Sequence, residues 1–386
     1  MAAAEDTIKK SERLLWFVIL ASLVIGWVAG LFVHHSSIAD VLKKTLPEAV
    51  RFDSGQDEIY TGYNDIQGES DEVGYVAIRS AHGYAGPVTV AVGLDKNGTI
   101  FNALIVRQTE SAAFFRRVVD SGYPAKFKGK DCTDQFAIGD DVDAVTGATV
   151  SLEAVSKAAR MACSDIAVQR LGLEPIAKKK PEIQFGLPEI ILILLIVAGF
   201  GASGNKLPAK KYVKWGVLAG SIVFIGFVYK WPASLININS LLVGYWPGWR
   251  NHIYWYLLAA AILLPVILNG KTLYCSSICP FGATQEILVN IGGTRRQIPG
   301  NCLRILKILQ RSLAWVAVMC ALVFRNPALV SYDVSATFFT IIGQHWQFVL
   351  LALVLILSLF IVRPWCNCLC PLRAVFDFIR LLRRSL

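Results

Sequence analysis

The chain contains a series of apolar segments, each long enough to enter a lipid bilayer. The first, residues 14–33, has 20 consecutive uncharged and mostly apolar residues, about what a helix needs to cross roughly 30 Å of hydrocarbon. Only helices and closed barrels satisfy their backbone groups in lipid. The chain is therefore predicted to be an α-helical membrane protein with about six transmembrane helices, the others lying near 190–204, 215–228, 253–268, 312–330 and 346–362.

Two of these segments have an alternative interpretation. Residues 14–33 resemble a signal peptide, but the run is longer than a typical signal core and no good cleavage site follows before His34, so a retained anchor is expected. The fifth segment has a charge-free core of only 13 residues, 312–324, before Arg325-Asn326-Pro327. It is either a span or a buried, re-entrant segment.

Charge is distributed unevenly along the chain. Residues 34–182 hold 17 Lys and Arg against 21 Asp and Glu, whereas the remainder holds 21 against 7. Basic residues beside apolar spans report membrane topology, and no basic run here is interleaved with aromatic residues that stack on bases. Nucleic acid is therefore excluded as a partner, and the acidic region is expected to lie outside the membrane.

The basic residues also predict an orientation, because Lys and Arg near span ends prefer the cytoplasmic side. With six spans, nearly all basic clusters fall on one face; Lys178-Lys179-Lys180 disagree, although charges on a long translocated domain weigh less. We expect a multi-pass protein of a bacterial cytoplasmic (inner) membrane with both termini cytoplasmic. Its predicted parts are a cytoplasmic N-terminus (1–13), a first helix (14–33), an extracytoplasmic domain (34–182), a five-span membrane domain with an internal repeat (183–363) and a cytoplasmic tail (364–386).

The extracytoplasmic region is long enough to fold on its own and has a mixed α+β pattern. Two β-like runs, 88–92 and 99–106, flank an Asn97-Gly98 dipeptide, which is a strong hairpin signal. A further strand is expected at 75–78, and apolar residues recur at helical spacing over 152–171.

The segment just before this helix is Asp143-Ala-Val-Thr146-Gly147-Ala148-Thr149. A Gly-Ala pair flanked by hydroxyls at a helix start brings backbone amides near a phosphate, although a capped helix start looks the same. The heptapeptide resembles the flavinylation motif of the FMN-binding domain found in the Rnf and Nqr complexes and in NosR/NirI-type membrane flavoproteins. In that family an ApbE-type flavin transferase joins the FMN phosphate to the closing threonine, which implies covalent FMN on Thr149.

Other residues belong to this expected flavin site. The resemblance places the motif residues Asp143, Thr146, Gly147 and Ala148 beside the cofactor, with Ser151 as the nearest alternative attachment hydroxyl. Ala144 stands where Gly is more usual in the family. Thr109 and Glu110 resemble, less closely, the family's Glu-Thr region that lies against the flavin; alternatively they are a polar strand end on the surface.

A cysteine-proline phrase occurs twice, as Cys275-x3-Cys279-Pro280 and Cys366-x3-Cys370-Pro371, each after an apolar segment. Two cysteines four apart on a helical turn point the same way, and two such pairs provide four thiolates for one metal site. A single iron, a two-iron or four-iron cluster, and non-redox zinc all remain open. Four buried structural cysteines are the alternative to a metal site.

The paired phrases resemble the signatures of NosR/NirI-type and PceC-like proteins. NosR itself is larger, and the present chain lacks the ferredoxin-like cysteine runs that NosR carries after its last spans. The remaining cysteines have no matching partners; Cys132 and Cys163 are candidates for a disulfide, and Cys368 is a candidate substitute ligand. The resemblance as a whole implies an α-helical membrane protein with an extracytoplasmic α+β FMN-binding domain.

Two histidines, His252 and His345, precede the first cysteines of the two phrases by 23 and 21 residues. That spacing is about one membrane thickness in a helix. The pair is a tentative site for a haem or a quinone head group, and the alternative is an interfacial role for each.

The predicted function is a membrane electron-transfer flavoprotein, with electrons passing between a quinol or cytoplasmic donor and an extracytoplasmic acceptor through covalent FMN and a four-cysteine iron centre. Such a chain is a component of an oxidoreductase system, with quinol oxidation as one candidate activity. The alternatives are a membrane redox sensor or regulator, and a zinc-binding transport or maturation factor. The expected difficulty is the separation of the two centres by roughly 30 Å of hydrocarbon.

Overall fold

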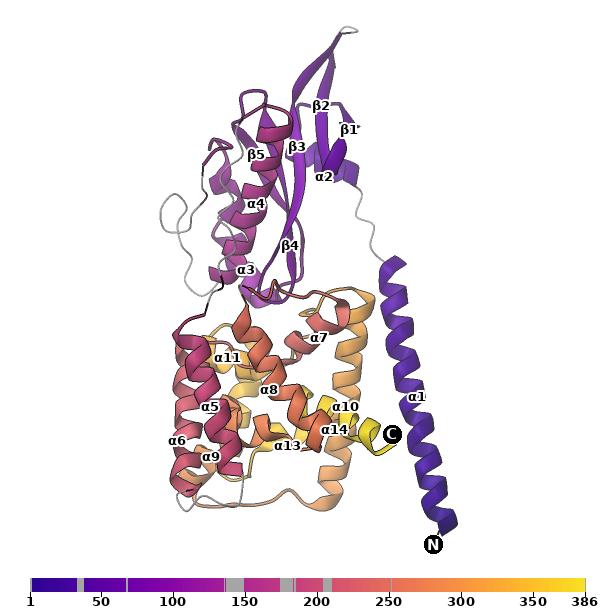
Figure 1. Ribbon diagram of the computed structural model, residues 1–386, viewed down its shortest axis with the longest axis vertical. Coiled ribbons are helices and arrows are strands. Elements are labelled where there is room, and N and C mark those ends of the chain that lie inside the picture. The colour runs from indigo at the N-terminus through magenta and orange to yellow at the C-terminus, as the bar shows by residue number, and fades with distance from the viewer. Residues whose placement is uncertain are drawn as a thin grey trace.

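The computed structural model describes residues 2–32, 38–66, 69–134, 136, 149–173, 183, 185–203, 210–250 and 252–385. It has two parts (Figure 1): a sheet-containing domain stands on a bundle of helices, and the long first helix runs beside the bundle. The helix α1 (Ala2–Phe32) packs against α10 (Gly300–Val323). Gly26 and Gly30 permit this approach, because a Cβ on Gly30 would collide with the carbonyl of Leu322.

The sheet domain is built on five antiparallel strands in sequential order. The predicted hairpin is present, with Gly98 in the left-handed region (φ +89°) and the carboxylate of Asp95 accepting from the amides of Asn97 and Thr99. The strands are β1 (Arg51–Ser54), β2 (Ile59–Ile66), β3 (Glu69–His82), β4 (Pro87–Asp95) and β5 (Ile100–Gln108).

One long helix covers this sheet. α4 (Thr149–Gln169) lies against β3 and β4, and its apolar stripe, including Val155, Ala159, Ala162 and Ile166, is fully buried. The small alanines allow close approach of helix to sheet. The helix expected at 152–171 is therefore confirmed, three residues longer at its start. α3 (Ala112–Asp120) contacts α4, whereas α2 (Ile38–Thr45) packs against β4 and β5 in a separate core cluster.

The bundle consists of helices that are mostly apolar and mostly short. The helices preceding the first cysteine phrase are α5 (Leu187–Ser203), α6 (Lys210–Gly220) with its π-helical continuation Ser221–Val228, α7 (Leu235–Val243) and α8 (Ile253–Asn269). After it come α9 (Pro280–Gly292), α10, α11 (Val334–Thr340), α12 (His345–Ser358), α13 (Pro364–Cys368) and α14 (Pro371–Ser385).

The expectation of six membrane-crossing helices needs correction. Within the described residues, two helices are long and apolar enough to cross a membrane, Lys211–Val228 and Gly300–Val323, or three if α11 and α12 form one span bent by 93°. Three further apolar helices, Trp16–Phe32, Leu187–Gly201 and Ile253–Asn269, are shorter. Length is the deciding quantity, because roughly 20 residues are needed for a straight crossing.

The fifth segment, expected to be either a span or a re-entrant segment, belongs to the 24-residue α10, which is long and apolar enough to cross a membrane. α10 begins at Gly300, well before the apolar core of that segment. A break instead precedes the sixth segment, where Ile341 ends α11 in the left-handed conformation (φ +56°) and α12 starts at His345. Ile341 itself is 72% exposed, so this break lies at the surface of the bundle.

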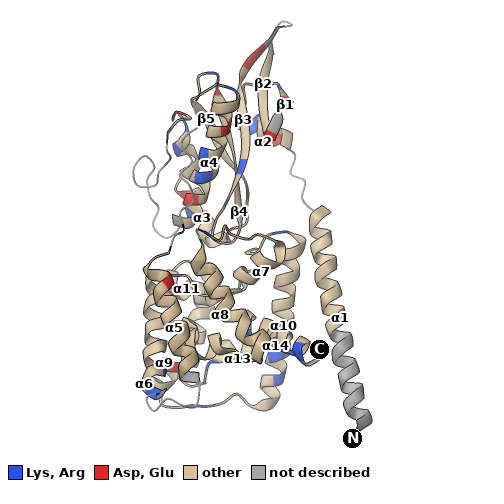
Figure 2. Cartoon of the chain, in the orientation of Figure 1, with Lys and Arg blue, Asp and Glu red and all other residues tan. Residues whose placement is uncertain are grey.

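Charged side chains are scarce in the bundle (Figure 2). Lys and Arg gather on α14 and on the end of α10 that lies farthest from the sheet domain, whereas the sheet domain carries both signs. The basic end of the bundle and the sheet domain therefore lie at opposite ends of the molecule.

Candidate metal and cofactor sites

The two cysteine-proline phrases fold in the same way. Cys279 and Cys370 each stand immediately before a helix whose first residue is proline, α9 and α14, the position that proline favours. The sulfur of Cys279 accepts from the amide of Gly282 at 3.4 Å, and the amide of Arg373 donates in the same way to Cys370. Each sulfur thus lies at a helix N-terminus, where a thiolate is stabilised.

Gln285 on α9 joins the first phrase to the second. Its side chain is fully buried, its Nε2 donates to Cys366 Sγ at 3.4 Å, and its Oε1 accepts from the amide of Trp365 at 3.0 Å. Gln310 on α10 is equally buried and donates through Nε2 to the carbonyl of Cys370 at 2.8 Å. Two buried glutamines therefore hold the second cysteine loop in place. One of them, Gln285, lies on α9, the helix that directly follows the first loop.

Arg363 forms a second connection between the phrases. It adopts the left-handed conformation (φ +48°), pairs with Glu286 at 2.9 Å and donates to the carbonyl of Cys275 at 2.9 Å. The ion pair is mostly buried, with each side chain 17% exposed, so loss of one partner leaves an uncompensated charge.

The two cysteine loops lie in one neighbourhood, joined by Gln285 and Arg363. Burial raises the pKa of all four thiols, and the charge of Cys366 further raises that of Cys275, Cys279 and Cys370. No three His, Cys, Asp or Glu side chains of the described residues converge on the position of a single ion. Four neighbouring, half-buried cysteines fit a multi-iron cluster. Its ligands bind different iron atoms and need not meet at one point, and the positive charge of the iron offsets that of the thiolates.

The expected flavin site is only partly visible. Thr149 begins α4, whereas Asp143, Thr146, Gly147 and Ala148 lie outside the described residues. Ser151 is buried two residues into that helix. The structure therefore shows α4, the helix that begins at Thr149. The covalent bond between FMN and Thr149 stays a prediction.

Thr109 and Glu110 are buried, with 1% and 2% exposure, which makes the alternative of a surface strand end wrong. Glu110 accepts from Ser151 Oγ at 2.9 Å and from the amide of Ala85 at 3.1 Å. Burial raises the pKa of this carboxyl despite these bonds. Glu110 thus ties the first turn of α4 to the loop between β3 and β4.

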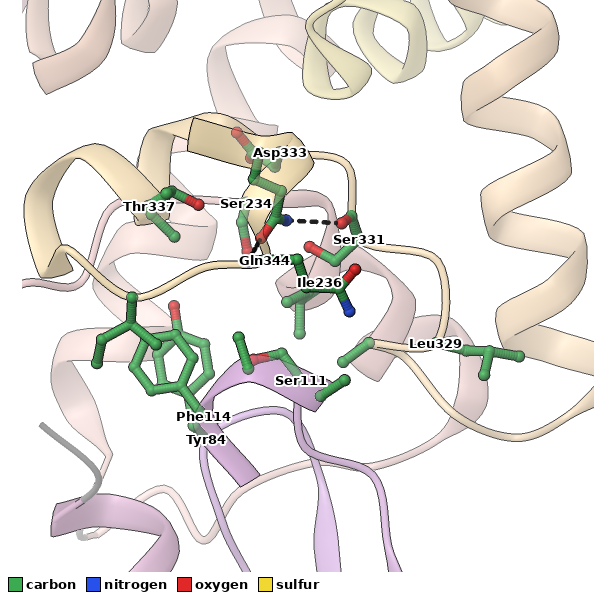
Figure 3. Close-up of a pocket in the computed structure, with 16 residues that line it drawn as sticks. Tyr84, Ser111, Phe114, Ser234, Ile236, Leu329, Ser331, Asp333, Thr337 and Gln344 are labelled. Atoms are coloured by element: carbon green, nitrogen blue, oxygen red, sulfur yellow. Dashed lines mark hydrogen bonds between the residues drawn. The ribbon is translucent and has the colours of Figure 1, made fainter. Parts of the chain in front are cut away.

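That loop rests on the helical bundle, as Figure 3 shows for the pocket at the junction. The ring of Tyr84 lies 5.5 Å from that of Trp231, and Ser240 on α7 donates to the carbonyl of Ala85. Tyr84, Ala85, Ile236 and Ala328 form a small apolar cluster between the two parts. The polar rim of the pocket includes Ser111 from the sheet domain and Ser234, Ser331, Asp333 and Gln344 from the bundle.

From Trp231 the contacts continue to the cysteines. The amide of Ala233, two residues later, donates to Tyr274 Oη at 3.2 Å, and Tyr274 is bonded to Cys275. Asp333 lines the same pocket as Tyr84. The pKa of Tyr84 is raised by burial, by Glu110 and by the charge of Asp333, and Asp333 also raises the pKa of Cys370, whose main cause is burial. Packed protein thus extends from the flavin-type domain to the cysteine loops.

The two tentative histidines are not brought together by any contact recorded for the described residues. The ring of His252 lies 6.0 Å from that of His82 in the sheet domain, at the junction of the two parts. Burial, and then His252, lowers the pKa of His82 to about 4. His345 begins α12. His252 is therefore a junction residue, and a cofactor role for the pair stays a prediction.

The other cysteines are free thiols. Cys132 and Cys163 lie in the same core cluster without a disulfide. Cys368 is buried and Cys302 is exposed near the start of α10. Sequence reasoning missed Gln310, Arg363, Tyr84 and Trp231, because none of them belongs to a motif.

Two family models match the chain. An FMN-binding domain matches residues 83–164, and a 4Fe-4S binding domain matches residues 251–299 and 345–386. The second match covers both cysteine phrases. It also favours the four-iron alternative over a single iron or zinc.

Curated relatives give the same result. The chain is 30% identical to the protein NirI of Paracoccus denitrificans over 227 residues, which is 53% of this chain and 33% of NirI. It is 26% identical to the regulatory protein NosR of Pseudomonas aeruginosa over 181 residues, 42% of this chain and 24% of NosR. NosR of Stutzerimonas stutzeri is 24% identical over 210 residues, 50% of this chain and 28% of NosR.

The chain thus spans a third or less of the length of these relatives. The two domain matches, the relatives and the paired cysteine loops nevertheless agree with one another. The chain thus combines an FMN-binding domain with a 4Fe-4S binding domain in a membrane redox protein that is similar to NirI and NosR.

Proposed function

We propose that the protein transfers electrons between a quinol or cytoplasmic donor and an acceptor outside the cytoplasm. FMN is held covalently on Thr149, after attachment by a flavin transferase, and an iron-sulfur cluster is held by Cys275, Cys279, Cys366 and Cys370. FMN supplies chemistry that exchanges one or two electrons, and the protein fixes its position and potential. In this proposal the FMN domain is extracytoplasmic and both termini are cytoplasmic, which the basic end of the bundle supports.

One observation carries the proposal: the continuous contacts between the two sites. Ser151 bonds to Glu110, Glu110 holds the loop that bears Tyr84, and Tyr84 contacts Trp231. Trp231 leads through Ala233 and Tyr274 to Cys275. Electrons tunnel more readily through packed atoms than across gaps, so this continuity supports exchange between the two sites.

The residues of this chain have defined roles in the proposal. Gln285, Gln310 and Arg363 orient the cysteine loops, and the N-termini of α9 and α14 stabilise thiolates. Glu110 is a buried acid whose raised pKa allows it to hold a proton beside the flavin helix.

The deciding experiment is an anaerobic reduction of the purified, flavin-loaded protein. We expect a soluble quinol analogue to bleach the flavin absorbance, and Cys275→Ala to prevent this while leaving covalent flavin in place. Cys320→Ala, which changes a half-buried cysteine of α10 outside both phrases, is the matched control. A flavin that no quinol reduces, together with zinc in the cysteine site by metal analysis, would overturn the proposal.

A second candidate is a redox sensor or regulator, favoured by the name "Regulatory protein" that the two NosR relatives carry. A sensor is expected to change redox state without sustained turnover. Continuous oxidation of quinol when an electron acceptor is supplied to the FMN side distinguishes transfer from sensing.

A further inference from the structure

A cavity of about 350 Å³ lies between five helices of the bundle. Its size falls within the usual range of small-molecule sites, roughly 300–1,000 Å³. The walls come from α1, α7, α8, α10 and α14, and include Ile19, Leu241, Leu263, Trp315, Val318 and Val375. It is distinct from the pocket below Tyr84 and from the cysteine loops.

The walls are apolar except at one place. Arg311 lines the cavity and pairs at 3.1 Å with Asp377, which also lies 3.6 Å from Arg380. Asp377 is only 18% exposed. An apolar site with one guanidinium in its wall matches a ligand that is mostly hydrocarbon and carries a hydrogen-bonding group at one end.

The cavity adjoins the cysteine site through two helices. Ala374 and Val375 lie on the first turns of α14, which begins directly after Cys370. On α10, Arg311 follows Gln310, whose side chain donates to the carbonyl of Cys370. A ligand in the cavity is therefore separated from the cysteine loop by a turn of helix.

The cavity also opens at the surface of the bundle. Trp315 and Leu242 line it and are 42% and 41% exposed. An apolar molecule can therefore enter it from outside the bundle.

We infer that this cavity binds an isoprenoid quinone or quinol, with its ring toward Arg311 and its tail along the apolar walls. The inference rests on the proposed function and adds the place where the donor binds. Oxidation of quinol to quinone releases two electrons and two protons, and FMN is the oxidant that takes up two electrons and two protons. A guanidinium donor suits the oxygens of such a ring, whereas an acyl chain has no group for it.

Binding is tested by the quenching of tryptophan fluorescence on addition of a short-tailed quinone analogue to the full-length protein in detergent. We expect the quenching to saturate with the analogue concentration. The saturable quenching should be lost in Trp315→Phe, which removes the fluorescent ring that lines the cavity. Ala314→Phe fills the cavity from α10 and is expected to weaken binding by about tenfold or more. Arg311→Gln is expected to weaken it more than Arg311→Lys, which retains a donor.

Leu353→Phe is the matched control, because Leu353 is exposed on α12 away from this cavity. Iron content and covalent flavin are measured in every variant to exclude misfolding. Equal quinone affinity in Ala314→Phe and in Leu353→Phe would show that quinone does not bind in this cavity. Displacement of the analogue by phospholipid at the same concentration would show that the cavity binds lipid and not quinone. If quinone binds here but never reduces the flavin, the binding site stands and the proposed function fails.

Discussion

The side-chain amide of Gln285 lies 3.4 Å from the sulfur of Cys366, although 81 residues separate the two in the chain. Gln285 stands on the helix that Cys279-Pro280 begins, so this bond connects the two copies of the repeated phrase. The same side chain accepts from the amide of Trp365. One buried glutamine thus links the halves of the proposed cluster site.

Gln285→Leu is expected to reduce the iron bound per protein. The change removes the partner of a buried amide, which costs about 1–3 kcal/mol, and frees the second loop. Iron and sulfide analysis measures the loss, with Asn290→Ala as control because Asn290 is exposed near the end of the same helix. Full iron content in Gln285→Leu would show that the bridge is dispensable.

Thr149→Ala is expected to abolish covalent flavin, because the substituted side chain has no hydroxyl for the phosphoester. Intact mass of the membrane-purified protein shows the adduct directly. Ser151→Ala is expected to keep it, since Ser151 bonds to Glu110. A flavin adduct that survives in Thr149→Ala and disappears in Ser151→Ala would transfer the attachment to Ser151.

The flavin domain is expected to gain stability as the pH falls toward the ordinary pKa of a glutamate, 4.5. Burial raises the pKa of Glu110 above 4.5 in the folded state, so the folded protein binds the proton more tightly than the unfolded chain does. The stabilisation is complete below the unfolded pKa and is lost as the pH rises through the folded pKa.

Glu110→Gln is expected to flatten this dependence in thermal unfolding followed by flavin fluorescence. Asp120→Asn, at an exposed carboxyl, is expected to leave the slope unchanged. An identical slope in wild type and Glu110→Gln contradicts the assignment.

Trp231→Leu is expected to slow reduction of the flavin several-fold with little change in either midpoint potential, because it removes the ring that contacts Tyr84. Trp231→Phe keeps an aromatic ring and is expected to recover most of the rate. Stopped-flow absorbance gives the rate, and Trp249→Leu changes an exposed tryptophan as control. Equal rates in the Leu and Phe variants argue for a structural role only.

Cys302 tests the proposed orientation. It is the exposed cysteine among the described residues, and the proposal places it in the cytoplasm. A membrane-impermeant maleimide is expected to label it in inside-out vesicles only, and Cys302→Ser should lose the label. Asn97→Cys, in the exposed hairpin of the sheet domain, should show the opposite pattern. Labelling of both from the same side contradicts the topology.

Local sequence patterns predicted much of this protein. The Asn97-Gly98 hairpin, the apolar stripe of α4 and the two Cys-x3-Cys-Pro phrases depend on neighbours within a few residues, and such short-range preferences are visible in a sequence. The count of spans was less successful, because it depends on where each helix ends. Residues around 300–311 extended α10 beyond its apolar core, and the left-handed Ile341 divided the last segment into α11 and α12.

The amino-acid sequence by itself determined the membrane class, the flavin-type domain and the four cysteines, since composition, periodicity and motif spacing are local properties of the chain. Only the tertiary structure decided how the sites relate: Gln285 and Arg363 join loops about 80 residues apart, Glu110 is buried, and Tyr84 contacts Trp231 across two parts of the fold. These relationships arise from packing between distant segments, which no local pattern encodes.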